Sequence, residues 1–212
     1  MSLAQALEII QSARGTATGE PFDAGLACGF TPLHLQTFFH AALQSRLTRP
    51  VRLHCGIFGD LIGNIEKFPA ELHAGAVVIE WGDLDSRLAF RHLGGWRPAH
   101  MPDLVATFAR RMEHLESAIR AAAARFPVAV LFPALRLPPA FFSVNARASA
   151  AALALEASVA SAAARLAEVP GVSIVNRQEL ELRSAASERH DLKSELFSGF
   201  PFTRAHAEAA AG

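Results

Sequence analysis

The segment 82–101 gathers many side chains that could do chemistry. It holds two acidic residues, three arginines, two histidines and one tryptophan, and it is long for a connection between a strand and a helix. It follows an apolar run typical of a buried strand, so it would begin at the carboxyl end of a parallel sheet, where ligands bind in open α/β folds. This segment is therefore the first candidate for a functional surface.

Three residues of this segment are candidates for binding a substrate. Arg87 and Arg91 carry forked donors that suit a carboxylate or a phosphate, although they could equally pair with the acidic residues around them. Trp96 follows a pair of glycines that permits an unusual turn. Its indole could stack on a sugar ring, or it could simply anchor the loop to the sheet.

The motifs of several common chemistries are absent from the sequence. It contains no G-x-G-x-x-G or G-x-x-x-x-G-K-[ST] phosphate loop and no G-x-S-x-G nucleophile elbow. The nine histidines show no zinc-ligand spacing, and the two cysteines are not spaced as C-x-x-C. We therefore expect no metal and no cofactor.

The composition narrows the partners and the compartment. The 20 basic residues balance the 20 acidic ones, so no net field would attract nucleic acid or anionic lipid. Two cysteines are too few for a disulfide framework, and no leader peptide is recognisable at the start of the chain. We expect a cytoplasmic protein that binds neither nucleic acid nor membrane.

Five short apolar runs alternate with helical patterns along the chain. With 51% hydrophobic residues the chain can bury a sizeable core. The first expected strand ends near residue 28, and the other four span 51–55, 76–81, 128–132 and 172–175. The expected helices span 2–14, 33–47, 102–125 and 147–168. Thr31 and Pro32 have the look of the N-cap and first residue of the second helix. The pattern predicts one α/β domain over residues 1–212, a three-layer α/β/α sandwich with a central parallel sheet of about five strands.

The order of these pieces resembles the SGNH/GDSL hydrolase superfamily, which implies a flavodoxin-like sandwich of the SGNH type. More narrowly, it resembles the SGNH-like N-terminal module of the haloacid-dehalogenase-type glyceryl-transfer proteins of polyketide pathways. The segments that carry the resemblance are Ala27-Cys28-Gly29-Phe30-Thr31, the run 56–63, Trp81-Gly82-Asp83-Leu84-Asp85, Asp191 and Gly199-Phe200-Pro201-Phe202-Thr203. Asp-x-Asp after a strand also superficially resembles the dehalogenase-type phosphatases, but Gly82 intervenes and Arg87 replaces their later Thr or Val.

The resemblance implies roles for particular residues. The position of the family's serine nucleophile falls on Gly29, which leaves Cys28 or Thr31 as the nucleophile if the register slips. The remaining candidate catalytic residues are Asp83, Asp85, Asp191 and His206, and the candidate oxyanion-hole residues are Gly29, Gly59 and Asn64. Asp83 or Asp85 could instead cap a helical turn, and His206 could act as the base only if the terminal helix folds back over the crevice.

Two functions follow as expectations. The first is an esterase or acyltransferase that acts on an acyl ester of a glycan or of a carrier-bound biosynthetic intermediate. The second is a catalytically silent binding or scaffold module of a polyketide or glycan biosynthetic assembly. The expected partners are a small-molecule or carrier-bound acyl substrate, and an acyl carrier protein or a dehalogenase-type partner domain.

Overall fold

A computed structural model describes residues 1–89, 98–133 and 149–212 of the chain. Its single sheet contains five parallel strands in the order β2-β1-β3-β4-β5. The strands are β1 Phe22–Ala27, β2 Val51–Cys55, β3 Ala74–Val78, β4 Val128–Leu131 and β5 Val172–Ile174. The predicted fold class is confirmed.

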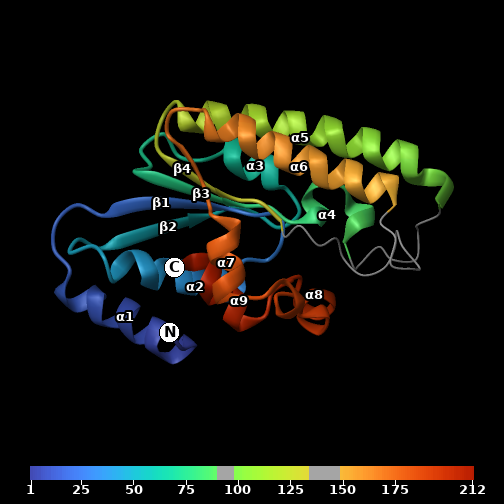
Figure 1. Ribbon diagram of the computed structural model, residues 1–212. Coiled ribbons are helices and arrows are strands. Elements are labelled where there is room, and N and C mark those ends of the chain that lie inside the picture. The colour runs from blue at the N-terminus through green and yellow to red at the C-terminus, as the bar shows by residue number, and fades with distance from the viewer. Residues whose placement is uncertain (90–97, 134–148) are drawn as a thin grey trace.

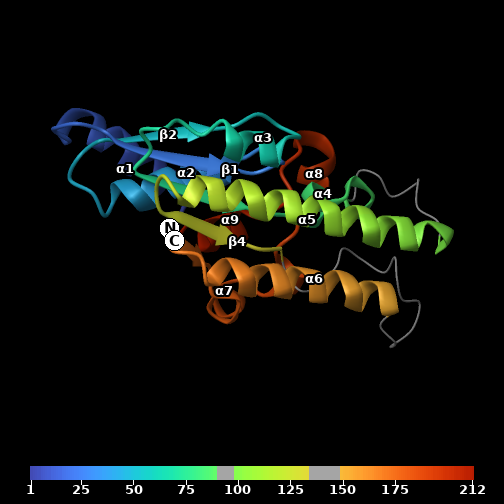
Figure 2. The same cartoon turned by 90° about the horizontal axis from the view of Figure 1, so that it is seen from above.

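Helices cover both faces of this sheet (Figure 1). One face carries α1 Leu3–Thr16, α2 Leu33–Gln44, α7 Arg177–Arg183 and α9 Arg204–Ala211. The other carries α3 Leu61–Glu66, α5 Met101–Ala123 and α6 Ala150–Ala167. Two short helices, α4 Trp81–Leu84 and α8 Leu192–Ser198, lie near the carboxyl ends of the strands (Figure 2).

Each face of the sheet has its own hydrophobic core. Phe108, Leu115 and Ile119 of α5 pack with Leu155 and Val159 of α6 on one side. On the other side, side chains of β1 and α2 pack with Phe200, Phe202 and the alanines of α9. The strands are apolar because both of their faces are covered, as the sequence predicted.

The start of α2 differs from the prediction by one residue. The helix begins at Leu33, and Pro32 occupies the cap position with no side-chain cap. Thr31 is not the N-cap; its backbone N–H instead donates to the carbonyl of Gly199 at 3.0 Å. This bond ties the end of the chain to the carboxyl edge of the sheet.

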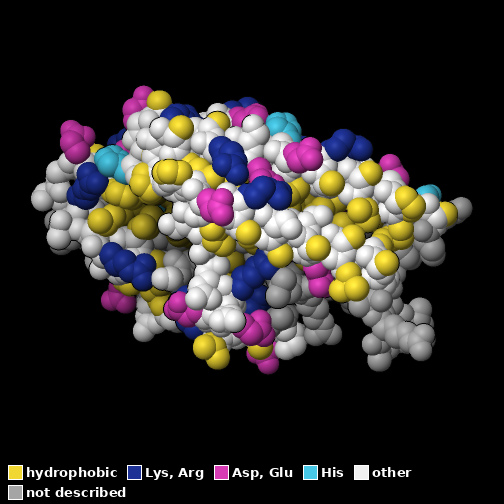
Figure 3. All heavy atoms as spheres, turned by 45° about the horizontal axis from the view of Figure 1, so that its top comes forward, with side chains coloured by type: hydrophobic (Ala, Val, Ile, Leu, Met, Phe, Trp, Pro, Cys, Tyr) yellow, Lys and Arg dark blue, Asp and Glu magenta, His cyan; other side chains and the backbone are white. Residues whose placement is uncertain are grey.

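The helix α6 is long and apolar enough to cross a membrane by length and composition alone. It is the one such helix among the described residues, and the core helix of a globular domain also meets this criterion. Its residues Leu155, Val159, Ala162 and Leu166 are buried in the core that it shares with α5. The outer face of this layer mixes acidic and basic side chains with apolar ones (Figure 3).

Candidate functional site

A pocket of about 480 Å³ lies at the carboxyl ends of β1 and β3. The chain runs from β1 to β2 in one direction and from β3 to β4 and β5 in the other, so this is the point where the strand order reverses. Open α/β sheets bind their ligands at such a point. An apolar wall, which includes Phe30, Phe58, Leu61, Trp81, Leu84 and Leu88, faces a polar group made of Glu80, Asp83, Ser86, Thr107, Arg111, His190 and Glu195.

Asp83 lies in the turn that follows β3. Its carboxylate accepts the backbone N–H of Glu80 at 2.8 Å, and the Glu80 side chain accepts the N–H of Asp83 in return, so the two form a capping box at the start of α4. This turn ends the strand earlier than the predicted residue 81. The capping role proposed for Asp83 is therefore present, and the same residue also lines the pocket.

The surroundings of Asp83 favour its neutral form. Burial raises its pKa to about 7, and the negative charge of Glu80 adds to that rise. Hydrogen bonds from the backbone of Glu80 and Gly29 and the positive charge of Arg111 oppose it. A carboxyl group that exchanges its proton near neutral pH can act as an acid or as a base.

Gly29 is the residue that the family resemblance places at the serine position, and Asp83 fills the space beside it. A Cβ atom built on Gly29 would overlap the carboxylate of Asp83. The Gly29 N–H donates a hydrogen bond to that carboxylate. A serine therefore does not fit at residue 29 unless Asp83 moves.

His190 reaches the same pocket from the C-terminal part of the chain. Its Nε2 lies 3.4 Å from Oε2 of Glu80, 110 residues away in sequence. An antiparallel bridge to Phe202 holds the His190 backbone, and its ring packs against the Phe202 ring. Burial disfavours the charged ring, but the carboxylates of Glu80 and Glu195 outweigh burial and raise the pKa of His190.

The two predicted nucleophiles do not line the pocket. Cys28 is buried, its thiol donates to the carbonyl of Phe30 at 3.2 Å, and burial raises its pKa well above the usual range. A thiol in such a place stays protonated and is a poor nucleophile. Thr31 is partly buried at the start of α2 and is not among the residues that line the pocket.

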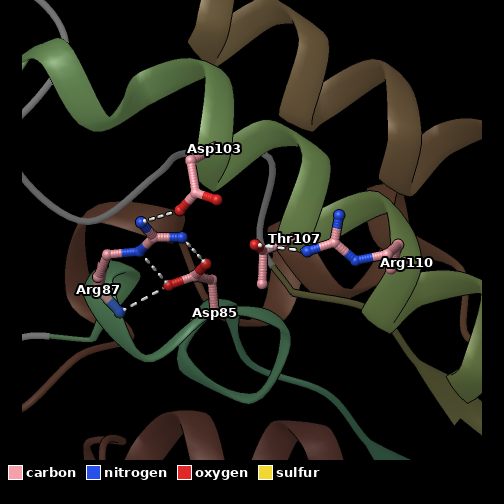
Figure 4. A network of polar contacts seen from close by, with 5 residues as sticks. All are labelled: Asp85, Arg87, Asp103, Thr107 and Arg110. Carbon is pink, nitrogen blue, oxygen red and sulfur yellow. Dashed lines mark hydrogen bonds and ion pairs between the residues drawn. The ribbon is translucent and has the colours of Figure 1, made fainter.

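Asp85 forms an ion pair with Arg87 and does not line the pocket (Figure 4). Arg87 Nε and Nη2 bind its two carboxylate oxygens at 2.9 and 2.6 Å, and Arg87 Nη1 binds Asp103 at 2.8 Å. Asp85 also accepts the backbone N–H of Arg87 as the cap of the following turn. The pairing interpretation is confirmed for Arg87, whose guanidinium binds two carboxylates.

The two residues predicted to supply the family's Asp and His are placed elsewhere. Asp191 caps α8 through the N–H of Ser194 at 2.9 Å. His206 is buried on α9, where its Nδ1 lies 2.9 Å from the hydroxyl of Ser184 and its ring packs edge-on to Phe202. Because α9 packs on α2, it does not fold back over the crevice, and burial lowers the pKa of His206 to about 3.

The predicted oxyanion donors are engaged within the protein. Gly59 lines the pocket, but its N–H donates to the carbonyl of Gly29 at 2.7 Å. Asn64 is buried, and its amide bonds the carbonyls of Cys28 and Ile57 and the N–H of Ile57. Arg91 and Trp96 lie outside the described residues.

Sequence reasoning missed Glu80, Arg111, His190 and Glu195 as residues of the pocket. The histidine directly before Asp191 was a signal, because this part of the chain already carried the family resemblance. Its partner was hidden, since Glu80 ends an apolar run and reads as the last residue of a strand. Among the described residues, no group of His, Cys, Asp and Glu side chains has the arrangement of a metal site.

Comparison with known proteins supports the fold and leaves the chemistry open. No family model and no curated protein matches the chain by sequence. The N-terminal part of BF1531 from Bacteroides fragilis, a structure that contains a phosphatase domain and was solved with Mg, is similar over 100% of this chain with a TM-score of 0.72 and 7% identity. This chain spans about half of that structure, 54%.

An extracellular lipase from Streptomyces rimosus is similar over 88% of this chain and 94% of its own, with a TM-score of 0.50 and 12% identity. At these identities the likeness concerns the fold alone. It gives coarse support to an SGNH-like fold, of a kind found in hydrolases.

Proposed function

We propose that this chain is an SGNH-like domain that binds an acyl ester in the β1/β3 pocket and hydrolyses it. The observation that carries the proposal is the meeting, in one pocket, of a His190–Glu80 pair, a carboxyl group with a pKa of about 7 and an apolar wall. Ligand pockets typically combine an apolar lining with a few convergent polar groups. The substrate is a small molecule or a carrier-bound intermediate.

The reaction would use water as the nucleophile, because residue 29 is glycine and the space beside it is filled. The water oxygen adds to the acyl carbon while the His190–Glu80 pair takes its proton. Asp83, in its acid form, donates a hydrogen bond to the developing oxyanion. The intermediate then expels the alcohol, which leaves with the proton held by the pair. Such general acid–base help contributes roughly 10²–10⁴-fold to a rate.

The apolar wall would hold the acyl chain beside these groups. Phe30, Leu61 and Trp81 line the inner part, and Phe58 lies towards solvent, 56% exposed. A second alcohol or a thiol in place of water would turn the same chemistry into acyl transfer. The family resemblance makes a carrier-bound acyl group the favoured substrate.

Hydrolysis of short-chain p-nitrophenyl esters by the purified chain tests the proposal. We expect His190→Gln and Glu80→Gln to lower kcat/KM about 10²-fold or more. His114 and Glu66 form a similar pair, 3.3 Å apart, on the exposed surface. His114→Gln and Glu66→Gln are thus matched controls that should keep full activity. Equal activity in all four variants would refute the proposal.

A second candidate function, a catalytically silent binding module, is favoured by the overlap of Asp83 with the serine position. The partner would be an acyl carrier protein or a dehalogenase-type domain. The BF1531 structure supports the second partner, since it contains a phosphatase domain and is about twice as long as the matched part. Calorimetric binding of a non-hydrolysable acyl amide, together with no turnover of the matching ester, would support this function over hydrolysis.

A further inference from the structure

Arg177 lies at the same edge of the sheet as the pocket, but beside β4 and β5. It is the first residue of α7 and follows the end of β5 by three residues. Its guanidinium carbon lies 5.8 Å from the centre of the Phe132 ring, directly after the end of β4. Arg177 therefore occupies the carboxyl edge of these two strands, where parallel sheets bind ligands.

Two nitrogens of this guanidinium have no hydrogen-bond partner. Within the described ranges, every other buried side-chain nitrogen or oxygen has a hydrogen-bond partner, and Arg177 Nε and Nη2 have none. Buried polar groups nearly always have a partner, and a charged group more so. The residue as a whole keeps a part exposed to solvent, although Nε and Nη2 themselves are covered.

These two atoms form the edge with which an arginine grips an acid. Elsewhere in this protein, Arg87 uses Nε and Nη2 to hold both oxygens of Asp85, and Arg165 uses the same pair to hold both oxygens of Glu116. Side-on binding by this edge fits a carboxylate or a phosphate and adds geometric selectivity. Arg177 presents the same edge without an acid.

The charges around Arg177 reinforce the requirement for an anion. Burial lowers its pKa, and the nearby positive charge of Arg189 lowers it further. Arg189 is itself satisfied, since its Nε binds the carbonyl of Ser184 at 2.8 Å and its Nη2 binds Glu181 at 2.6 Å. The segment 134–148, which follows β4, contains no Asp or Glu in its sequence.

We propose that Arg177 is the centre of a binding site for a phosphate or carboxylate group of a ligand, with Arg189 adding positive potential. Since Nε and Nη2 are covered in this structure, the ligand takes this edge after the guanidinium turns toward the exposed side of the residue. This site is separate from the His190–Glu80 pair, so it does not depend on the proposed hydrolysis. It would hold an anionic group of a substrate or partner that lies along the carboxyl edge of the sheet.

Two measurements on the full chain test this site: calorimetric titration and thermal unfolding. Each is made with inorganic phosphate and, separately, with acetate, and chloride keeps the ionic strength constant. We expect phosphate or acetate to bind and to raise the Tm. Stronger binding of phosphate would assign a phosphoryl group, and stronger binding of acetate would assign a carboxylate. No binding of either at millimolar concentration would overturn the proposal.

Three variants identify the residue responsible. Arg177→Met should weaken anion binding at least tenfold, and Arg177→Lys, which keeps the charge without the fork, should weaken it less. Arg183→Gln, at the exposed end of the same helix, is the control that should bind like the original chain.

The Tm without added anion separates a binding role from a structural one. Arg177→Met should then unfold at the same or a higher temperature, because it removes an unpartnered buried cation. A lower Tm combined with unchanged anion binding would overturn the proposal.

Discussion

At the scale of single residues, Gly29 and Asp83 share one space. We expect Gly29→Ser to lower the free energy of unfolding by about 1–3 kcal/mol, because the new side chain overlaps the carboxylate of Asp83. The double variant Gly29→Ser/Asp83→Ala should lose less than the sum of the two single changes, since the shorter side chain makes room. Urea unfolding measures all three, and simple additivity would contradict the shared space.

The raised pKa of Asp83 makes stability depend on pH. Its folded pKa of about 7 lies above the ordinary value near 3.8, so its contribution to stability is complete below pH 4 and is lost as pH rises through 7. The Asp83→Asn variant lacks this loss. From pH 5 to pH 8, the original chain should lose on the order of 1–3 kcal/mol relative to Asp83→Asn. Parallel stability curves from urea unfolding would show that Asp83 does not titrate in this range.

His206 contributes to the stability of the fold, whereas His190 lies in the pocket. His206 is buried beside Ser184, away from the pocket, so His206→Gln should cost about 1–3 kcal/mol of stability through lost packing and hydrogen bonding. The variant should keep its turnover per folded molecule. Calorimetry measures the folded fraction, and the ester assay measures the turnover. Loss of turnover in a fully folded His206→Gln protein would return this residue to the role of base that the family resemblance implied.

At the scale of elements, α8 borders the pocket with one of its sides, next to Phe58. Glu195 and Gly199, at either side of its last turn, line the pocket, while Phe197, two residues from each, lies on the opposite side of the helix and is 85% exposed. We expect Phe58→Ser, at the exposed rim of the pocket, to raise the KM of decanoyl esters several-fold and to leave that of acetyl esters nearly unchanged, whereas Phe197→Ser should change neither. Equal effects on both chain lengths would argue against a role for this rim in holding the acyl chain.

The elements that the sequence predicted well are those with a strong local signal. The apolar runs at 51–55 and 128–132 became strands with nearly the expected ends, and the helix expected over 102–125 spans Met101–Ala123, with Pro102 and Asp103 in its first turn. The short helices α7 and α8 have seven residues each and depend on single caps, Asn176 and Asp191, so their periodicity is too brief to detect.

The pocket could be predicted less well because it depends on contacts between distant parts of the chain. His190 and Glu80 are 110 residues apart, and the segment that carries His190 is held by hydrogen bonds from the N–H of Asp191 to the carbonyl of Pro201 and from the N–H of Thr31 to the carbonyl of Gly199. No local pattern records such contacts. The family resemblance located the right segments but offered His206 as the candidate base, 16 residues after the histidine that lines the pocket.

At the scale of the whole molecule, the fold and its chemistry separate. The sheet places a pocket at the point where strand order reverses, as in other open α/β folds. The similarity to a lipase and to part of BF1531 extends over most of the chain, yet the sequence resemblance implies Gly29 at the position of the SGNH serine. Fold therefore supports a hydrolase-like scaffold, while function rests on the groups in the pocket.

The most direct test is intact-mass spectrometry of the protein during turnover of a p-nitrophenyl ester. We expect p-nitrophenol to be released while the protein keeps its unmodified mass, because water and not a side chain attacks the acyl carbon. The release should fall to the background rate in His190→Gln. An acyl adduct on Cys28 or Thr31, or a release no faster than in His190→Gln, would contradict hydrolysis by the His190–Glu80 pair.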